Sequence, residues 1–344
     1  MCSKVKVDLL STSALKTRSS VEKSGGTQGI NYSVPSSPRS PSSPVLVLLS
    51  GQRRAMEAVR IVLSVAGGAG NAALMLSLLR SARLKPFEMF LLGLSVANLE
   101  EIAAVDVYSV LVSRSAVSAS SGRCRDLKFF TLVGEIGSIL FTVVISVYRC
   151  QKLRMRVNRP VLLDGRGPAR ALAVSCAALA LLFASPTLLI NLDWGHSNAS
   201  SRACPADFFQ CSSSQCPTRN RIYKYSFLLL FILVPLLVVT LSGAVIMRIL
   251  VMRTAFANRE SHVLQRGVSG FQRSTVAILA AMTLFQLNWT VYLVLQLAFD
   301  PNTLPSWSQL EFLVTSFYSA VSPYVYGIGN NLFSRTRFTR TTGA

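Results

Sequence analysis

The chain is 344 residues long and carries a formal charge of +20, from 35 Lys and Arg against 15 Asp and Glu. Only 15% of its residues are charged, 51% are apolar, and its mean hydropathy is positive. A soluble domain carries roughly a quarter charged residues, and a nucleic-acid-binding protein needs a dense basic surface. The composition therefore excludes a nucleic-acid partner and indicates a protein embedded in a lipid bilayer.

Residues 1–55 form a Ser/Pro-rich N-terminal tail. The run 33–44 is of low complexity and cannot bury a hydrophobic core, so we expect the tail to be disordered. Its polar, Lys-bearing start does not resemble a signal peptide. Met56 leads directly into the first apolar stretch. The alternative is therefore that Met56 is the initiator and that residues 1–55 are an upstream extension.

Seven apolar stretches follow, each long enough to cross ~30 Å of hydrocarbon as a helix of about 20 residues. They cover residues 59–79, 87–112, 128–148, 171–192, 225–252, 274–299 and 308–328. Short alternating strands are absent from the sequence, which disfavours an outer-membrane barrel. We predict an all-α fold, with a seven-transmembrane helix bundle over residues 56–329 and a short amphipathic tail over residues 330–344.

The basic residues predict the orientation of the bundle. If the N-terminus lies outside the cell, eighteen Lys and Arg fall in cytoplasmic segments and eight in the three outer loops. Cytoplasmic loops of membrane proteins carry the excess of Lys and Arg. We therefore expect the N-terminus outside and the C-terminus in the cytoplasm.

Four cysteines fall on the outer, oxidising side, where disulfides persist. They are Cys124 at the start of the third stretch and Cys204, Cys211 and Cys216 in the loop after the fourth. We expect Cys124 to pair with Cys211, or else with Cys204 or Cys216, and the remaining two to pair together or leave a free thiol. The same loop holds a glycosylation acceptor at Asn198.

Acidic side chains inside the stretches are costly in hydrocarbon, so each is a candidate functional residue. Besides Glu100, they are Glu101, Asp106, Glu135 and Glu311. Glu135 precedes Arg149 by 14 residues, or about 21 Å of helix, which places Glu135 in the outer half of the bundle. An acidic pocket there would favour a cationic ligand or a ligand with hydrogen-bond donors. The alternative is that each carboxyl is satisfied by a neighbouring helix.

A polar stripe runs along the sixth stretch. Asn288, Tyr292 and Gln296 recur every four residues and share one helix face. In hydrocarbon such a face turns toward the interior of the bundle. We expect Asn288 and Tyr292 to contact the ligand, although helix–helix bonding explains the stripe equally well.

Short motifs are spread over the stretches. They are Gly70-Asn71, Leu94-Ser95-Val96-Ala97-Asn98, Tyr148-Arg149-Cys150 with Cys124 25 residues before Arg149, Pro235, and Ser322-Pro323-Tyr324-Val325-Tyr326. This combination resembles the class A, or rhodopsin-like, G-protein-coupled receptors. Asn98 stands where that family carries its sodium-binding Asp, Tyr148 where Asp-Arg-Tyr has its Asp, and Ser322 where Asn-Pro-x-x-Tyr has its Asn.

The departures from the class A motifs narrow the resemblance. The fourth stretch lacks Trp, and the sixth carries Asn288-Trp289 without Cys-Trp-x-Pro. Together with the missing Asp residues, this pattern resembles the vomeronasal type 1 receptors and the fish olfactory receptors of the class A-like type. Bitter taste receptors, which also diverge from the class A motifs, are the alternative.

The resemblance implies a chemosensory receptor in the plasma membrane of sensory neurons. A small odorant or pheromone would bind between the outer halves of the helices, and a heterotrimeric G protein of the inhibitory type would be activated. Arg149 would contact the G protein, with Tyr148, Pro323, Tyr326, Asn98 and Asn71 taking part in activation. No cofactor is implied.

Other classes of membrane protein fit the sequence less well. His196 and His262 fall in different loops and cannot share a metal site, and nucleophile or phosphate-binding motifs are absent from the sequence, so we expect neither an enzyme nor a bound metal. A retinal protein needs a Lys in the last stretch, which has none. A transporter remains an alternative, although paired inverted repeats are not visible.

Overall fold

The computed structural model describes residues 44–80, 83–113, 121–154, 165–190, 209, 211, 216–257, 265–299 and 307–329. The chain divides into two units, Met1–Pro44 and Val45–Ala344, and the helices below belong to the second. The predicted amphipathic tail over residues 330–344 lies outside the described residues.

Helices account for nearly all of the described chain, and none of the described residues is in a strand. The elements are α1 (Pro44–Leu79), α2 (Pro86–Ser113), α3 (Ser121–Arg154), α4 (Arg166–Ala184), α5 (Pro186–Ile190), α6 (Thr218–Phe227), the π-helix η2 (Leu228–Leu233), α7 (Val234–Ala257), α8 (Gln265–Ala298) and α9 (Trp307–Gly329). The predicted all-α class is confirmed.

Helix covers most of each of the seven predicted stretches, of which residues 191–192 lie outside the described residues. Proline explains two interruptions of a continuous α-helix. Residues 171–192 contain a break at Ser185, where Pro186 begins α5. In the fifth stretch, η2 lies just before Pro235. Because proline has no N–H and crowds the carbonyl four residues earlier, the preceding turn widens.

The first helix differs from its prediction. Helix α1 begins at Pro44 rather than at residue 59. Residues 44–55 are therefore helical and do not belong to a disordered tail. The stretch Val45–Leu49 is apolar and free of helix-breaking residues, so it can extend the helix of the first span.

The start of α2 carries local helix-initiation chemistry. Pro86 occupies the first helical position, where a missing N–H is harmless. The carboxylate of Glu88 accepts a hydrogen bond of 3.0 Å from the backbone N–H of Lys85, which is half of a capping box. This fixes where α2 begins, and with it the place of Phe87.

Five helical segments among the described residues are long and apolar enough to cross a membrane, within α1, α3, α4–α5, α6–α7 and α8. Helix α2 carries four acidic residues, and α9 is rich in Ser, Thr and Tyr. The polar groups of these two helices are largely buried: Glu101 and Ser322 are 0% exposed.

The outer faces of the helices are apolar. Val62, Val174 and Leu241 are 66–68% exposed, whereas Asn71 and Asn98 are completely buried. An apolar exterior around a polar interior is what a bilayer selects, because lipid cannot hydrogen-bond to polar groups. The chain is therefore built as a multi-pass membrane protein.

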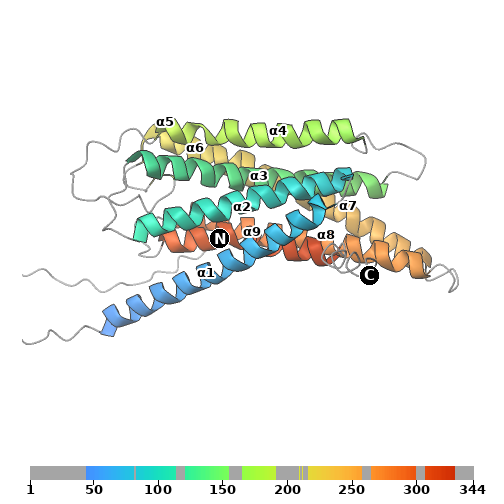
Figure 1. Ribbon diagram of the computed structural model, residues 1–344, viewed down its shortest axis with the longest axis horizontal. Helices are drawn as coiled ribbons and strands as arrows, with labels where there is room; N and C mark the ends of the chain where they lie inside the picture. Colours follow the sequence, from blue (N-terminus) through green and yellow to red (C-terminus); the bar gives the residue numbers. More distant parts are fainter. Residues whose placement is uncertain are drawn as a thin grey trace, which may run out of the picture. The chain divides into compact units, whose positions relative to one another are not determined.

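Helix α3 is the centre of the bundle. It contacts α2, α4, α5, η2, α7 and α8, and its contact with α2 is the most extensive in the chain. Figure 1 shows α2 and α3 running side by side, with α4 beyond α3. The closeness of α2 and α3 depends on Gly134, since a Cβ there would lie 2.6 Å from the backbone nitrogen of Glu101 and 2.8 Å from its Cα.

We therefore predict that Gly134→Ala destabilises the bundle by about 1–3 kcal/mol, the cost of overpacking. Gly68→Ala is the matched control, because a Cβ at Gly68 meets nothing within 4 Å and alanine favours helix. The measurement is the temperature at which detergent-solubilised receptor loses monodispersity. Equal temperatures for the two variants would contradict the prediction.

Candidate functional site

A network of neutral polar side chains joins α1, α2, α3 and α9. The Asn98 amide donates to Asn71 Oδ1 and to Ser322 Oγ, both at 3.1 Å. Its Oδ1 accepts from Ser138 Oγ at 2.7 Å. Asn71 in turn donates to the backbone carbonyl of Ser319 at 2.8 Å. Asn98 and the three side chains bonded to it are all 0% exposed. The structure therefore brings the predicted residues Asn71 and Asn98 together.

We call the end of the bundle that holds Arg149 the Arg149 end, and the half that holds Glu135 the Glu135 half. Glu101 lies one helical turn beyond Asn98, away from Arg149. Its Oε2 accepts from Ser319 Oγ at 2.7 Å, and its Oε1 has no hydrogen-bond partner among the described residues. Since its side chain is 0% exposed, this oxygen is an unsatisfied acceptor inside the bundle.

Glu135 is the second buried carboxyl of this half. It is 2% exposed, and its Oε1 also lacks a hydrogen-bond partner within the described part of the chain. It interacts electrostatically with Glu101 and Glu311, and Tyr223 of α6 is also close enough to interact with it. Three of the four acidic residues predicted for a pocket therefore surround one region.

Glu311 is bound by its neighbours. Its Oε1 accepts from Gln296 Nε2 at 2.6 Å, and its Oε2 accepts from Trp307 Nε1 at 3.2 Å. Tyr292 lines the same α8–α9 contact. Glu311 thus holds the ends of α8 and α9 together.

Asp106, an alternative partner of Glu135 in the predicted acidic pocket, is bonded to α1. Its Oδ1 forms an ion pair with Arg60 at 2.6 Å and accepts from Ser64 Oγ at 2.8 Å. Both partners belong to α1. The charge of Asp106 is therefore used to attach α1 to α2, a contact that hydropathy could not predict.

The predicted stripe on α8 faces the interior. Asn288, Tyr292 and Gln296 are 7%, 2% and 4% exposed. Asn288 Nδ2 is unpartnered in the described structure. Gln286 takes a different direction and donates to the Leu236 carbonyl of α7 at 2.9 Å.

Trp289 is a site residue that sequence reasoning missed. It is 1% exposed, packs edge-on to Tyr292 with ring centroids 5.4 Å apart, and contacts Phe285 at 6.1 Å. Its indole Nε1 has no partner among the described residues. The sequence did contain a signal for this residue, since Trp289 follows Asn288 of the polar stripe and a buried indole N–H usually has an acceptor.

Arg149 lies against an aromatic ring of α2. Its guanidinium carbon is 3.6 Å from the centroid of the Phe87 ring. Phe87 stacks with Tyr148, with centroids 6.5 Å apart and planes 18° apart. Lys152 Nζ donates to the hydroxyl of Tyr148 at 3.2 Å.

A cavity of about 180 Å³ opens at this Arg149 end. Helices α3, α7 and α8 line it through Arg149, Lys152, Leu153, Ile246, Thr275 and Ile278. Tyr326 of α9 is 0% exposed and interacts electrostatically with Arg149. The structure thus gathers the predicted residues Tyr148, Arg149 and Tyr326.

Pro323 lies in the interior of α9 and against α1. A Cβ at Gly70 would lie 3.1 Å from Pro323 Cγ, and the neighbouring Tyr324 donates to the Ala66 carbonyl at 2.6 Å. Tyr318, one turn earlier on α9, shares a hydrogen bond of 2.8 Å with Thr142 of α3. The motif around Pro323 therefore fixes α9 between α1 and α3.

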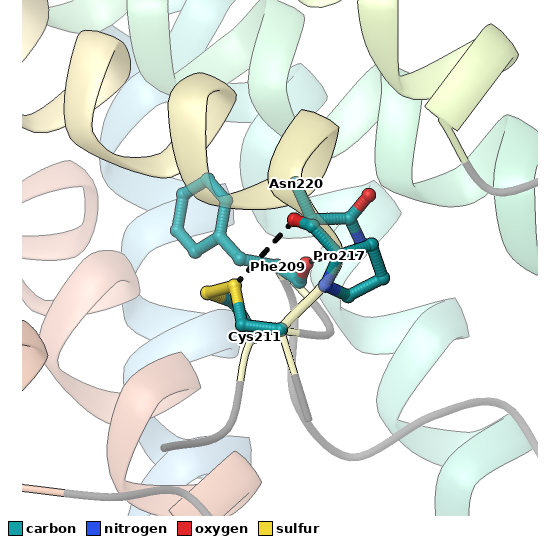
Figure 2. Close-up of a disulfide and its surroundings, with 5 residues drawn as sticks. Phe209, Cys211, Pro217 and Asn220 are labelled. Atoms are coloured by element: carbon teal, nitrogen blue, oxygen red, sulfur yellow. Dashed lines mark hydrogen bonds between the residues drawn. A yellow bond between two sulfur atoms is a disulfide. The ribbon is translucent and has the colours of Figure 1, made fainter. Parts of the chain in front are cut away.

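The disulfide differs from the preferred prediction. Cys211 pairs with Cys216 rather than with Cys124. Figure 2 shows this bridge beside Pro217, where Asn220 of α6 donates to the Phe209 carbonyl at 3.1 Å. Cys124 is also disulfide-bonded, and its partner lies outside the described residues, as do Cys204 and Asn198. The paired cysteines are five positions apart in the sequence. Spacing alone does not select among the three possible connectivities of four cysteines.

The chain belongs to the 7 transmembrane receptor (rhodopsin family), whose profile matches residues 70–326. It is therefore a G-protein-coupled receptor: a multi-pass membrane protein, not an enzyme, with a ligand and a G protein as partners. A comparison with curated proteins found no match.

The pairing of Cys211 with Cys216 leaves Cys204 as the remaining loop cysteine predicted for Cys124. We expect peptide mapping of the non-reduced receptor to yield two bridged pairs, Cys124–Cys204 and Cys211–Cys216. Cys204→Ser should release Cys124 for alkylation, whereas Cys176→Ser, at a buried free thiol of α4, should not. A bridge between Cys124 and Cys211 would refute this assignment.

Proposed function

We propose that the chain is a chemosensory receptor that binds a small odorant or pheromone in the Glu135 half of the bundle and activates a heterotrimeric G protein of the inhibitory type. In this proposal the Glu135 half faces the outside and the Arg149 end faces the cytoplasm. The excess of Lys and Arg in the segments at the Arg149 end supports this orientation.

The observation that carries the proposal is a pair of buried carboxyls, each with one unpartnered oxygen. Glu101 Oε1 and Glu135 Oε1 lack hydrogen-bond partners among the described residues, although neither side chain is more than 2% exposed. A buried acceptor left without a partner costs about 1–3 kcal/mol. A ligand that carries an ammonium group or several hydroxyl donors would remove that cost.

Donor groups lie in the same half and would bind a polar acceptor on the ligand. Asn288 Nδ2 and Trp289 Nε1 are both unpartnered within the described helices, and Tyr292 packs on Trp289 with centroids 5.4 Å apart. We propose Glu135, Glu101, Asn288 and Tyr292 as the ligand-binding residues. Glu311 then closes the site, and Asp106 stays with Arg60.

The chemosensory assignment rests on the motif departures. The absence of an acid at Tyr148 and at Asn98, and of Cys-Trp-x-Pro around Trp289, resembles vomeronasal type 1 and fish class A-like olfactory receptors. This resemblance implies a location in the plasma membrane of sensory neurons and coupling to an inhibitory-type G protein. A bitter-taste-type receptor is the second candidate. Assaying the receptor with a panel of amines, acids and steroids, and with a panel of bitter compounds, shows which set activates it and so separates the two candidates.

We predict that Glu135→Gln weakens the response to an agonist with an amine or hydroxyl donor by at least tenfold. The amide keeps the shape but loses the charge and one acceptor, and hydrogen bonds to charged groups contribute about 1.5–3 kcal/mol. The measurement is the half-maximal concentration for GTP exchange, using the best agonist from the screen. Asp106→Asn, whose carboxylate faces α1, is the control and should leave the potency within about threefold. An unchanged potency for Glu135→Gln would remove this residue from the site.

We predict further that Arg149→Ala abolishes agonist-dependent GTP exchange while surface expression stays intact. The alanine variant loses the cation that lines the cavity at the Arg149 end, where a G-protein segment would bind. Arg154→Ala, one turn further along α3 and exposed, serves as the control. Retained exchange in the Arg149→Ala receptor would contradict the assigned role.

A further inference from the structure

We propose that Phe87 is a positioning residue for Arg149. Its ring holds the guanidinium toward the start of α2 in the resting receptor, and so limits G-protein activation when no agonist is bound. The proposal rests on the role of Arg149 given above, and it names the group that controls when Arg149 is available.

The geometry of the contact is that of a cation–π pair. The guanidinium carbon of Arg149 lies 3.6 Å from the centroid of the Phe87 ring, well within the ~6 Å over which such pairs attract. Planar guanidinium groups stack on aromatic faces more readily than ammonium groups do. The contact therefore uses a property specific to arginine.

The Phe87 ring is itself held in place. Phe87 lies in the first turn of α2, beside Pro86, and the bond from Lys85 N–H to Glu88 fixes that turn. Tyr148 stacks with its ring at 6.5 Å. A ring fixed by its helix and by a second ring can hold a cation in one position.

A second cation in the same region uses a different ring. Lys152, one turn after Tyr148, has its Nζ 5.5 Å from the centroid of the Tyr148 ring and donates to the hydroxyl at 3.2 Å. Arg149 and Lys152 thus each lie over an aromatic ring, Phe87 for Arg149 and Tyr148 for Lys152.

The consequence for signalling follows from competition. Arg149 also lines the cavity between α3, α7 and α8, so the ring and a G-protein segment in the cavity compete for one guanidinium. An interaction made in only one of two states shifts their populations by its own free energy. Loss of the Phe87 ring should therefore raise the fraction of receptors in which Arg149 is released by roughly two- to thirtyfold. This range is the free energy of cation–π contacts expressed as a ratio of populations.

The test compares Phe87→Leu with Phe87→Trp in the full-length receptor without agonist. Leucine keeps an apolar side chain but has no π face, whereas Trp is the best cation–π partner. Phe90→Leu is the matched control, because Phe90 also packs on Tyr148, with centroids 5.8 Å apart, and is 0% exposed. We expect basal GTP exchange on added heterotrimer to rise severalfold for Phe87→Leu, and to stay at or below wild type for Phe87→Trp and Phe90→Leu.

A second readout needs no G protein. Spin labels at Arg154→Cys on α3 and Val276→Cys on α8, both exposed positions, report the distance between these helices when the free cysteines are replaced by serine. We expect Phe87→Leu to add a longer-distance population, and Phe87→Trp to restore the wild-type distribution. In an Arg149→Leu background, Phe87→Leu should change nothing further.

These readouts separate the outcomes. A shifted distance without GTP exchange in any receptor would support the role of Phe87 and count against the proposed coupling. An unchanged distance distribution with Phe87→Leu would overturn the inference, as would an equal shift in the Arg149→Leu background. A shift with Phe90→Leu as large as that with Phe87→Leu would also overturn it, because it would show a general effect of core packing.

Discussion

The close approach of α2 and α3 at Gly134 is the constraint on which the interior depends. A single methyl group at this position would collide with the backbone of Glu101. Because the two helices are this close, Ser138 of α3 reaches Asn98 of α2 at 2.7 Å, and Glu135 lies within electrostatic range of Glu101. The neutral network and the buried carboxyls are therefore two results of one packing contact.

Buried polar groups are satisfied differently around Asn98 and in the Glu135 half. Around Asn98, donors and acceptors of α1, α2, α3 and α9 satisfy one another. In the Glu135 half, carboxylate oxygens and the Asn288 amide remain unpartnered among the described residues. Unsatisfied buried groups are costly, and a bound ligand is one partner that can remove the cost. That contrast supports the proposal that a ligand binds in the Glu135 half.

Hydropathy predicted all seven helical stretches, because a bilayer demands about 20 apolar residues per crossing. It also predicted that the Asn288 stripe faces inward, since a polar face in hydrocarbon has nowhere else to go. It could not predict that Asp106 pairs with Arg60, that Cys211 pairs with Cys216, or that Phe87 lies under Arg149. Each of these contacts depends on how separate segments are placed in space, which the periodicity of one helix does not encode.

Ser319 of α9 connects the buried carboxyl Glu101 to the neutral network around Asn98. Its hydroxyl donates to Glu101 at 2.7 Å, while its carbonyl accepts from Asn71 at 2.8 Å. In the proposed function, a ligand that binds the carboxyl of Glu101 would compete with this hydroxyl, which lies one turn of α9 before Ser322. Tyr318, next to Ser319, bonds to Thr142 of α3, and Tyr326 lies two turns further toward Arg149. Helix α9 therefore contacts the buried carboxyl Glu101, the neutral network around Asn98 and, through Tyr326, the region of Arg149.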